Sequence, residues 1–262
     1  MSSKRVIIVG NAPTVLLNEY GSKIDEFDIV IRINDYEIDK YEKHVGNKVD
    51  IHTRAKNHEM RPRSVHDFKE IWLKDGWQKV AKMPYNYLPY DDMGSDKIKL
   101  VVPGKKKFHD YKSVRKFKQS VNLPHLSKVN VRRISKSTGY VAIERAIEKY
   151  WGGDKNNPIT IYGFNFQNVK DVKLTKTQRP HYYKYEPPNS YDILTTKLDS
   201  QNHVWELERY LIQKLIKENK IKPLFEPEIF NDDVDLSHLE PCIKHTPTHL
   251  IGKVNPKTDK RY

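Results

Sequence analysis

The stretch Arg5-Val6-Ile7-Ile8-Val9-Gly10-Asn11-Ala12-Pro13-Thr14 decides the fold class. Its apolar run predicts a short buried strand, and the segment from Gly10 to Thr14 breaks that strand before a predicted helix. This order of strand, tight turn and helix is how a βαβ unit begins. Because backbone N–H groups at such a turn can bind phosphate, the turn is also the first candidate site.

Further strands and helices alternate along the chain. The predicted strands are 27–33, 48–52, 99–102 and 158–162, and the predicted helices are 139–151 and 203–219. Gly152-Gly153 supplies a stop for the first of these helices, and the second has one apolar side. Alternation of this kind predicts an α/β fold with a mostly parallel sheet, in which ligands bind at the carboxyl ends of the strands.

A chain of 262 residues is long enough for one large domain. We expect that domain to span residues 1–224, with 53–133 as an insertion or lid and 225–262 as an extended tail rich in proline and charge. The sequence contains no run of about 20 apolar residues, so no transmembrane segment is expected. The single cysteine, Cys242, excludes an internal disulfide and favours a reducing compartment. We therefore expect a cytoplasmic protein.

The formal charge of +13 is unevenly distributed. Residues 105–133 hold ten Lys or Arg residues against one acid, Asp110, with aromatic residues interleaved. The basic residues that we select as candidate nucleic-acid contacts are Lys105, Lys106, Lys107, Arg115, Lys116, Lys118, Arg132 and Arg133. A net charge of +9 over this segment exceeds what solubility requires and favours a polyanionic partner.

Several polar residues and glycines lie where predicted strands end or helices begin. They are Gly10 and Asn11, Arg32 and Asn34, Ser137, Thr138 and Gly139, and Tyr162 and Gly163. Taken singly, each is explained as well by a turn, a helix cap or the core. The turn at Gly10 lacks the further glycines of a dinucleotide-binding fingerprint.

Taken in order, these residues resemble the successive motifs of the sialyltransferases. Two later elements extend the resemblance, namely His181-Tyr182-Tyr183 and the pair His203 and Glu208 in a His-x-x-x-x-Glu pattern. The resemblance implies a Rossmann-like, single-domain sialyltransferase-type fold, here with a basic insertion or lid. It also implies an inverting glycosyltransferase that takes its sugar from a CMP-sugar donor.

The resemblance further implies a role for each motif. Asn11 and Asn34 would contact the phosphate and ribose of the nucleotide, and Ser137, Thr138 and Gly139 would line the cytidine and donor-sugar site. His181 and Tyr182 would contact the leaving phosphate, and His203 would be the base. Inversion requires such a base near its working pH, which suits imidazole, but the two histidines could exchange roles.

Glu208 lies about 140° around a helix from His203, so the two should not pair directly. We expect Glu208 to fix neighbouring backbone or side chains, with a solvated helix carboxylate as the alternative. The chain departs from the animal enzymes in lacking their disulfide and membrane anchor, and in having Lys184 after His-Tyr-Tyr. These departures fit a microbial or viral relative and leave the donor sugar open.

Metal-independent chemistry is expected, because His, Tyr and amide donors can stabilise a leaving phosphate. Asp233-Val234-Asp235 has the Asp-x-Asp pattern that binds divalent ions in another glycosyltransferase class, but it lies in the acidic tail and no metal is assigned to it.

The basic segment 105–133 leaves two acceptor hypotheses and one non-enzymatic alternative. Duplex DNA carrying hydroxymethylated bases, as in bacteriophage DNA modification, is favoured by charge, although the base would have to flip out of the helix. A bacterial surface glycan is the competing acceptor, with the basic segment facing anionic lipid. A non-enzymatic nucleic-acid-binding protein is the alternative from another class.

Overall fold

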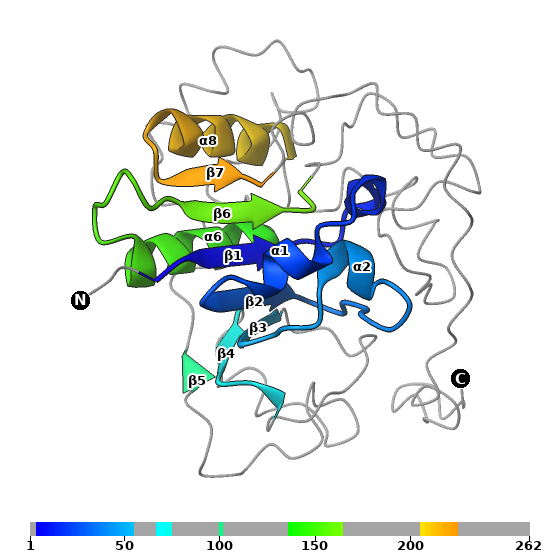
Figure 1. Ribbon diagram of the computed structural model, residues 1–262. Helices are drawn as coiled ribbons and strands as arrows, with labels where there is room; N and C mark the ends of the chain where they lie inside the picture. The colour runs from blue at the N-terminus through cyan, green and yellow to red at the C-terminus, as the bar shows by residue number, and fades with distance from the viewer. Residues whose placement is uncertain (1–3, 55–66, 75–99, 102–135, 165–204, 225–262) are drawn as a thin grey trace, which may run out of the picture.

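A single parallel β-sheet with helices on both faces forms the centre of the molecule (Figure 1). The computed structural model describes residues 4–54, 67–74, 100–101, 136–164 and 205–224. Its strands are β1 (Val6–Val9), β2 (Ile29–Ile33), β3 (Ile51–Arg54), β4 (Glu70–Leu73), β5 (Leu100–Val101), β6 (Ile159–Tyr162) and β7 (Ile221–Pro223). They lie in the order β5-β4-β3-β2-β1-β6-β7, and every neighbouring pair is parallel. The predicted parallel α/β sheet is confirmed.

The helices divide into two layers because side chains alternate along each strand. They are the 3-10 helix η1 (Pro13–Leu17), α1 (Gly21–Asp25), α2 (Glu42–Val45), α6 (Thr138–Ala146), the π-helical turn η5 (Ile147–Trp151) and α8 (Trp205–Lys217). Val6 and Ile8 of β1 pack with α6 and α8 in the larger core. Ile7 and Val9 point to the other face, where η1, α1 and α2 cover a smaller core.

Local signals explain where the later helices end. Gly152 adopts a left-handed conformation, with φ +56°, directly after η5, so the predicted stop at Gly152-Gly153 is confirmed. After α8, Asn219 is also left-handed, and the Lys220 N–H donates to the Leu215 carbonyl at 3.0 Å. This turn leads the chain directly into β7. Within the described residues, none of the helices is long and apolar enough to span a bilayer.

Two sequence predictions change in the structure. The helix predicted after Pro13 is a short 3-10 helix followed by α1, and the strand predicted at 48–52 lies at Ile51–Arg54. The strand predicted at 99–102 is present as β5, which pairs with β4 in the central sheet. Strand β4 was not predicted, because so short a strand carries little periodic signal.

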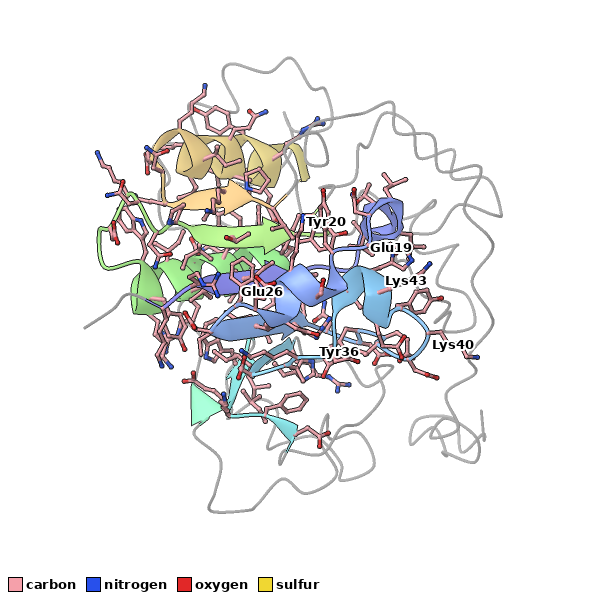
Figure 2. All side chains as sticks on the ribbon, in the orientation of Figure 1. Glu19, Tyr20, Glu26, Tyr36, Lys40 and Lys43 are labelled. Atoms are coloured by element: carbon pink, nitrogen blue, oxygen red, sulfur yellow. The ribbon has the colours of Figure 1, made fainter. Side chains whose placement is uncertain are left out.

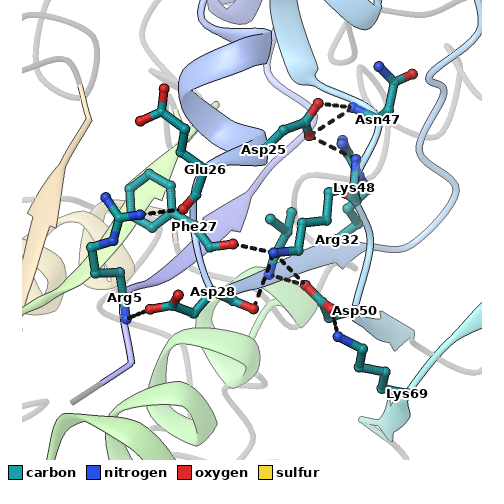
Figure 3. Close-up of polar contacts among 11 residues, drawn as sticks. Arg5, Asp25, Glu26, Phe27, Asp28, Arg32, Asn47, Lys48, Asp50 and Lys69 are labelled. Atoms are coloured by element: carbon teal, nitrogen blue, oxygen red, sulfur yellow. Dashed lines mark hydrogen bonds and ion pairs between the residues drawn. The ribbon is translucent and has the colours of Figure 1, made fainter. Parts of the chain in front are cut away.

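Polar contacts hold the amino ends of the strands together (Figure 3). Asp50, just before β3, accepts from the Val30 N–H at 2.9 Å and pairs with Lys69 at 2.5 Å. Asp25 at the end of α1 accepts from the backbone N–H groups of Asn47 and Lys48 at 2.8–3.0 Å. These contacts, which range from buried at Val30 to exposed at Asn47, lie at the end of the sheet opposite the candidate site.

An exposed ion pair joins the segment before α1 to α2, where Figure 2 labels both residues. Glu19 and Lys43 lie 2.8 Å apart, and each side chain is nearly two-thirds exposed. An exposed pair of this kind contributes little to stability, so the packing of α1 and α2 depends mainly on the buried side chains beneath them.

Candidate nucleotide-binding site

The order of the strands locates the site. After β1 the chain adds strands outward to β5, and it then returns to place β6 on the other side of β1. In open parallel sheets, ligands bind outside the carboxyl ends of the strands at such a change of direction. Here that position lies at the carboxyl ends of β1, β2 and β6, where the sequence predicted Gly10, Asn11, Asn34 and Gly163.

Gly10 and Gly163 allow β1 and β6 to approach each other closely beyond their last residues. A Cβ atom on Gly10 would lie 2.2 Å from the Gly163 carbonyl oxygen. Gly163 has φ +73°, and its carbonyl accepts from the Ala12 N–H at 3.1 Å. Both positions therefore require glycine for the backbone itself, which fixes the turn carrying Asn11.

Asn11 and Asn34 are brought to adjacent strand ends. The Asn11 side-chain amide donates to the Ile33 carbonyl at 3.0 Å, and Ile33 directly precedes Asn34. Asn34 adopts a left-handed conformation with φ +53°, which asparagine tolerates better than most residues. The two predicted nucleotide contacts therefore occupy one corner of the sheet.

Arg32 and Tyr162, also predicted at this site, have side chains buried in the protein. Arg32 donates to the Lys48 carbonyl at 3.0 Å and to the Val45 and Gly46 carbonyls at 2.8 Å, so it binds the carboxyl end of α2. The Tyr162 hydroxyl donates to the Val15 carbonyl at 2.9 Å. Both interactions hold the helices behind the strand ends, so these residues support the site through the fold.

The start of α6 lies against the same corner. A Cβ atom on Gly139 would lie 2.8 Å from the Phe164 ring and 3.6 Å from the Ile33 side chain. Glycine therefore lets the first turn of α6 approach the ends of β2 and β6. Thr138 is buried in that turn, and Ser137 caps it by accepting from the Tyr140 N–H at 3.0 Å.

Glu208 fastens α8 to this helix cap. Its carboxylate accepts from the Ser137 N–H at 2.5 Å and from the Ser137 hydroxyl at 2.6 Å, across 71 residues of sequence. The expectation that Glu208 fixes neighbouring backbone and side chains agrees with this contact. These two hydrogen bonds connect α8 to the start of α6, in addition to the packing between the two helices.

Burial raises the pKa of Glu208 from 4.5 to about 7, although both Ser137 hydrogen bonds and the charge of Lys74 lower it. Glu144 on α6 raises it further and itself pairs with the buried Lys136 at 2.5 Å. Burial likewise raises the pKa of Glu144, against the lowering effect of Lys136. Two carboxyl groups and two lysines therefore surround the α6 cap.

Several predicted residues lie outside the described part of the chain. These are His181, Tyr182, His203, the basic residues of 105–133 and the Asp233-Val234-Asp235 segment. A search of the described residues finds no group of three or more His, Cys, Asp or Glu side chains able to hold a metal ion. The metal-independent mechanism stays a prediction.

Three residues of this region were not predicted from the sequence. His52 lies in β3 and contacts the Asn34 carbonyl, while Lys136 and Lys74 approach Glu208 and its neighbour Glu144. A histidine within a strand and a lysine before a cap are common in proteins without such contacts. Only the folded positions of these residues connect them to the site.

The fold is that of a Rossmann-like protein, a class in which ligands bind at the carboxyl ends of the parallel strands. Residues 2–220 match glycosyltransferase family 29 (sialyltransferase). The chain belongs to this family.

Individual relatives match shorter segments. A β-1,6-galactosyltransferase, GALT29A, of Arabidopsis thaliana is 43% identical over 54 residues, which cover 20% of this chain and 14% of that protein. The CMP-N-acetylneuraminate-β-1,4-galactoside α-2,3-sialyltransferase of Rattus norvegicus is 31% identical over 84 residues, covering 31% and 22% respectively. These matches therefore span less than a quarter of either relative.

The crystal structure of a mammalian sialyltransferase is similar in fold, with a TM-score of 0.50 and 18% identity. The match covers 85% of this chain and 69% of that one. The Rossmann-like, sialyltransferase-type fold expected from the sequence motifs is thereby confirmed.

Proposed function

We propose that the protein is an inverting glycosyltransferase that moves a sugar from a CMP-sugar donor to a hydroxyl acceptor. Family membership supports glycosyl transfer. The convergence of Asn11, Asn34 and the α6 cap on one corner of the sheet supports a nucleotide-sugar site there. The rat relative is named for a CMP-sugar, which favours CMP over other nucleotides.

The contact between Glu208 and Ser137 is the main structural support for the proposal. Glu208 lies near the start of α8, and the proposed base His203 lies five residues before it in the sequence. Glu208 therefore joins the start of α8 to the α6 cap at the proposed nucleotide corner. The His-x-x-x-x-Glu pattern, whose His203 lies outside the described residues, is the reason for assigning the base to the same site.

The reaction is a single displacement. The base removes the proton of the acceptor hydroxyl while that oxygen bonds to the anomeric carbon. The bond from this carbon to the phosphate oxygen breaks, and CMP leaves with inversion of configuration. His203 is proposed as the base, and His181 with Tyr182 would stabilise the growing charge on the phosphate. The exchanged assignment of the two histidines is the alternative.

We propose a glycan hydroxyl as the first acceptor to test, because the rat relative is named for a galactoside acceptor. A hydroxymethylated DNA base is the second candidate, supported by the net charge of +9 over residues 105–133. The donor sugar stays open because the relatives' names include both a galactosyltransferase and a sialyltransferase.

To test this proposal, the full-length protein is incubated with CMP-N-acetylneuraminate or with UDP-galactose as the sugar donor. Each donor is paired with a β-galactoside or with duplex DNA containing hydroxymethylcytosine, and mass spectrometry detects the product. We expect transfer from the CMP-sugar to the galactoside, with NMR showing inverted anomeric configuration. Transfer from UDP-galactose alone would overturn the CMP assignment, and sugar found only on DNA would reverse the acceptor assignment.

A further inference from the structure

His52 stands out because it is fully buried in β3 and yet contacts the backbone of a proposed nucleotide-binding residue. Its Nε2 atom lies 2.6 Å from the Asn34 carbonyl oxygen. A carbonyl oxygen only accepts, so Nε2 must carry a proton and donate. The contact therefore fixes which ring nitrogen is protonated.

Two aromatic rings hold the imidazole in this orientation. The Tyr36 ring meets it edge to face, with centroids 5.5 Å apart and an interplanar angle of 87°. On another side, the centroid of Phe68 lies 4.8 Å away at an interplanar angle of 36°. Because His52 is buried between these rings, its Nε2–H is directed at Asn34 with little freedom to turn away.

Asn34 is held through consecutive backbone groups. The Asn11 side chain donates to the preceding Ile33 carbonyl, and the Asn34 N–H donates to the Thr53 carbonyl at 2.8 Å. His52 then holds the Asn34 carbonyl itself. These contacts hold Asn34 in a left-handed conformation, with φ +53°, which asparagine adopts more readily than most other residues.

We propose that His52 is a positioning residue for nucleotide binding, which acts by fixing the backbone of Asn34 and so the direction of the Asn34 side chain. This inference rests on the proposed function, because it assumes that Asn34 contacts the donor nucleotide. His52 itself need not contact the nucleotide. Its effect should therefore disappear when the Asn34 side chain is removed.

A double-mutant cycle tests this dependence, with CMP as the probe and calorimetry as the readout. His52→Leu should weaken CMP binding about fivefold to tenfold, which corresponds to the loss of one ordering hydrogen bond. In the Asn34→Ala background, the same change should have no further effect. His52→Gln retains a side-chain N–H donor and should recover most of the affinity.

His44 of α2 offers a control, because its Nδ1 atom lies 2.8 Å from the carbonyl of Asn18, a residue to which no nucleotide contact is assigned. His44→Leu should leave CMP affinity unchanged while removing a comparable contact between histidine and a carbonyl group. Equal losses in the His44 and His52 variants would mean that general destabilisation causes the effect. That result would overturn the positioning role.

A second readout without nucleotide separates this inference from the proposed function. In ¹⁵N-edited NMR spectra, His52→Leu should shift the backbone and side-chain amide signals of Asn34, whereas His44→Leu should not. If the wild type fails to bind CMP but these signals shift, the donor assignment falls and the positioning of Asn34 stands. A different outcome would overturn the inference about His52. In that outcome the wild type binds CMP, Asn34→Ala weakens the binding, and His52→Leu leaves it unchanged.

Discussion

Replacing Glu208 should change both the stability of the protein and its dependence on pH. The side chain is fully buried and accepts the Ser137 N–H and hydroxyl at 2.5 and 2.6 Å. Glu208→Ala leaves both partly buried Ser137 donors without this acceptor, at about 1–3 kcal/mol each, and also creates a cavity. We expect a total loss of about 3–5 kcal/mol, a large share of the 5–15 kcal/mol that is typical of folded domains.

The pH dependence follows from the pKa of Glu208, which burial raises from 4.5 to about 7. The folded state binds the proton of Glu208 more tightly than the unfolded state does. Protonation of Glu208 therefore contributes to the free energy of unfolding, and this contribution is fully present below pH 4.5. It is lost as the pH rises through about 7. The group should lower the free energy of unfolding by on the order of 3 kcal/mol across this window, with little change above it.

Urea denaturation of the wild type and Glu208→Gln at pH 5 and pH 8 measures this contribution. The glutamine cannot titrate, so the variant should lack most of the loss that the wild type shows between the two values. Glu218→Gln, at a partly exposed position after the same helix, is the matched control and should retain the wild-type pH dependence. An unchanged pH dependence in Glu208→Gln would refute the reasoning.

Other predictions concern the backbone at the site and the chemistry. Gly10→Ala should destabilise the protein by several kcal/mol, because the new Cβ would meet the Gly163 carbonyl oxygen at 2.2 Å; a thermal melt within 1 °C of the wild type would contradict this. His203→Ala should abolish transfer while leaving CMP affinity within about twofold of the wild type, whereas His181→Ala should reduce both transfer and CMP affinity. Calorimetry measures the affinity and single-turnover assays measure the transfer. The reverse pattern would exchange the roles of the two histidines. Transfer should continue in EDTA, and recovery only with Mn²⁺ or Mg²⁺ would favour a metal site such as Asp233 and Asp235.

The central strands could be predicted because their sequences are mostly apolar, interrupted only by Arg32 in β2 and Thr160 in β6. β1, β2 and β6 are buried on both faces, which is what a parallel sheet requires. β4 was missed because its apolar residues Ile71 to Leu73 are few and lie between charged residues. β7 was missed because it ends in Pro223, and a strand that pairs only with β6 can accept proline at the edge of the sheet.

The sequence motifs named candidate residues for the site, but they did not predict the interactions among those residues. Nothing in the sequence relates Glu208 to Ser137, because contacts across 71 residues have no local period. Arg32 was expected near the nucleotide, yet its guanidinium binds the carbonyl groups at the end of α2. A strand residue before the site can point to either face, and only the packed helix shows which face Arg32 uses.

Calorimetric titration of the full chain with CMP tests the central claim most directly, with UMP and GMP as comparisons and Asn34→Ala as the site variant. CMP should bind more tightly than the other two nucleotides, and Asn34→Ala should weaken CMP binding at least fivefold, about the effect of losing one hydrogen bond. Equal binding of all three nucleotides, or CMP affinity unchanged in Asn34→Ala, would contradict a CMP-sugar site at the carboxyl ends of β1 and β2.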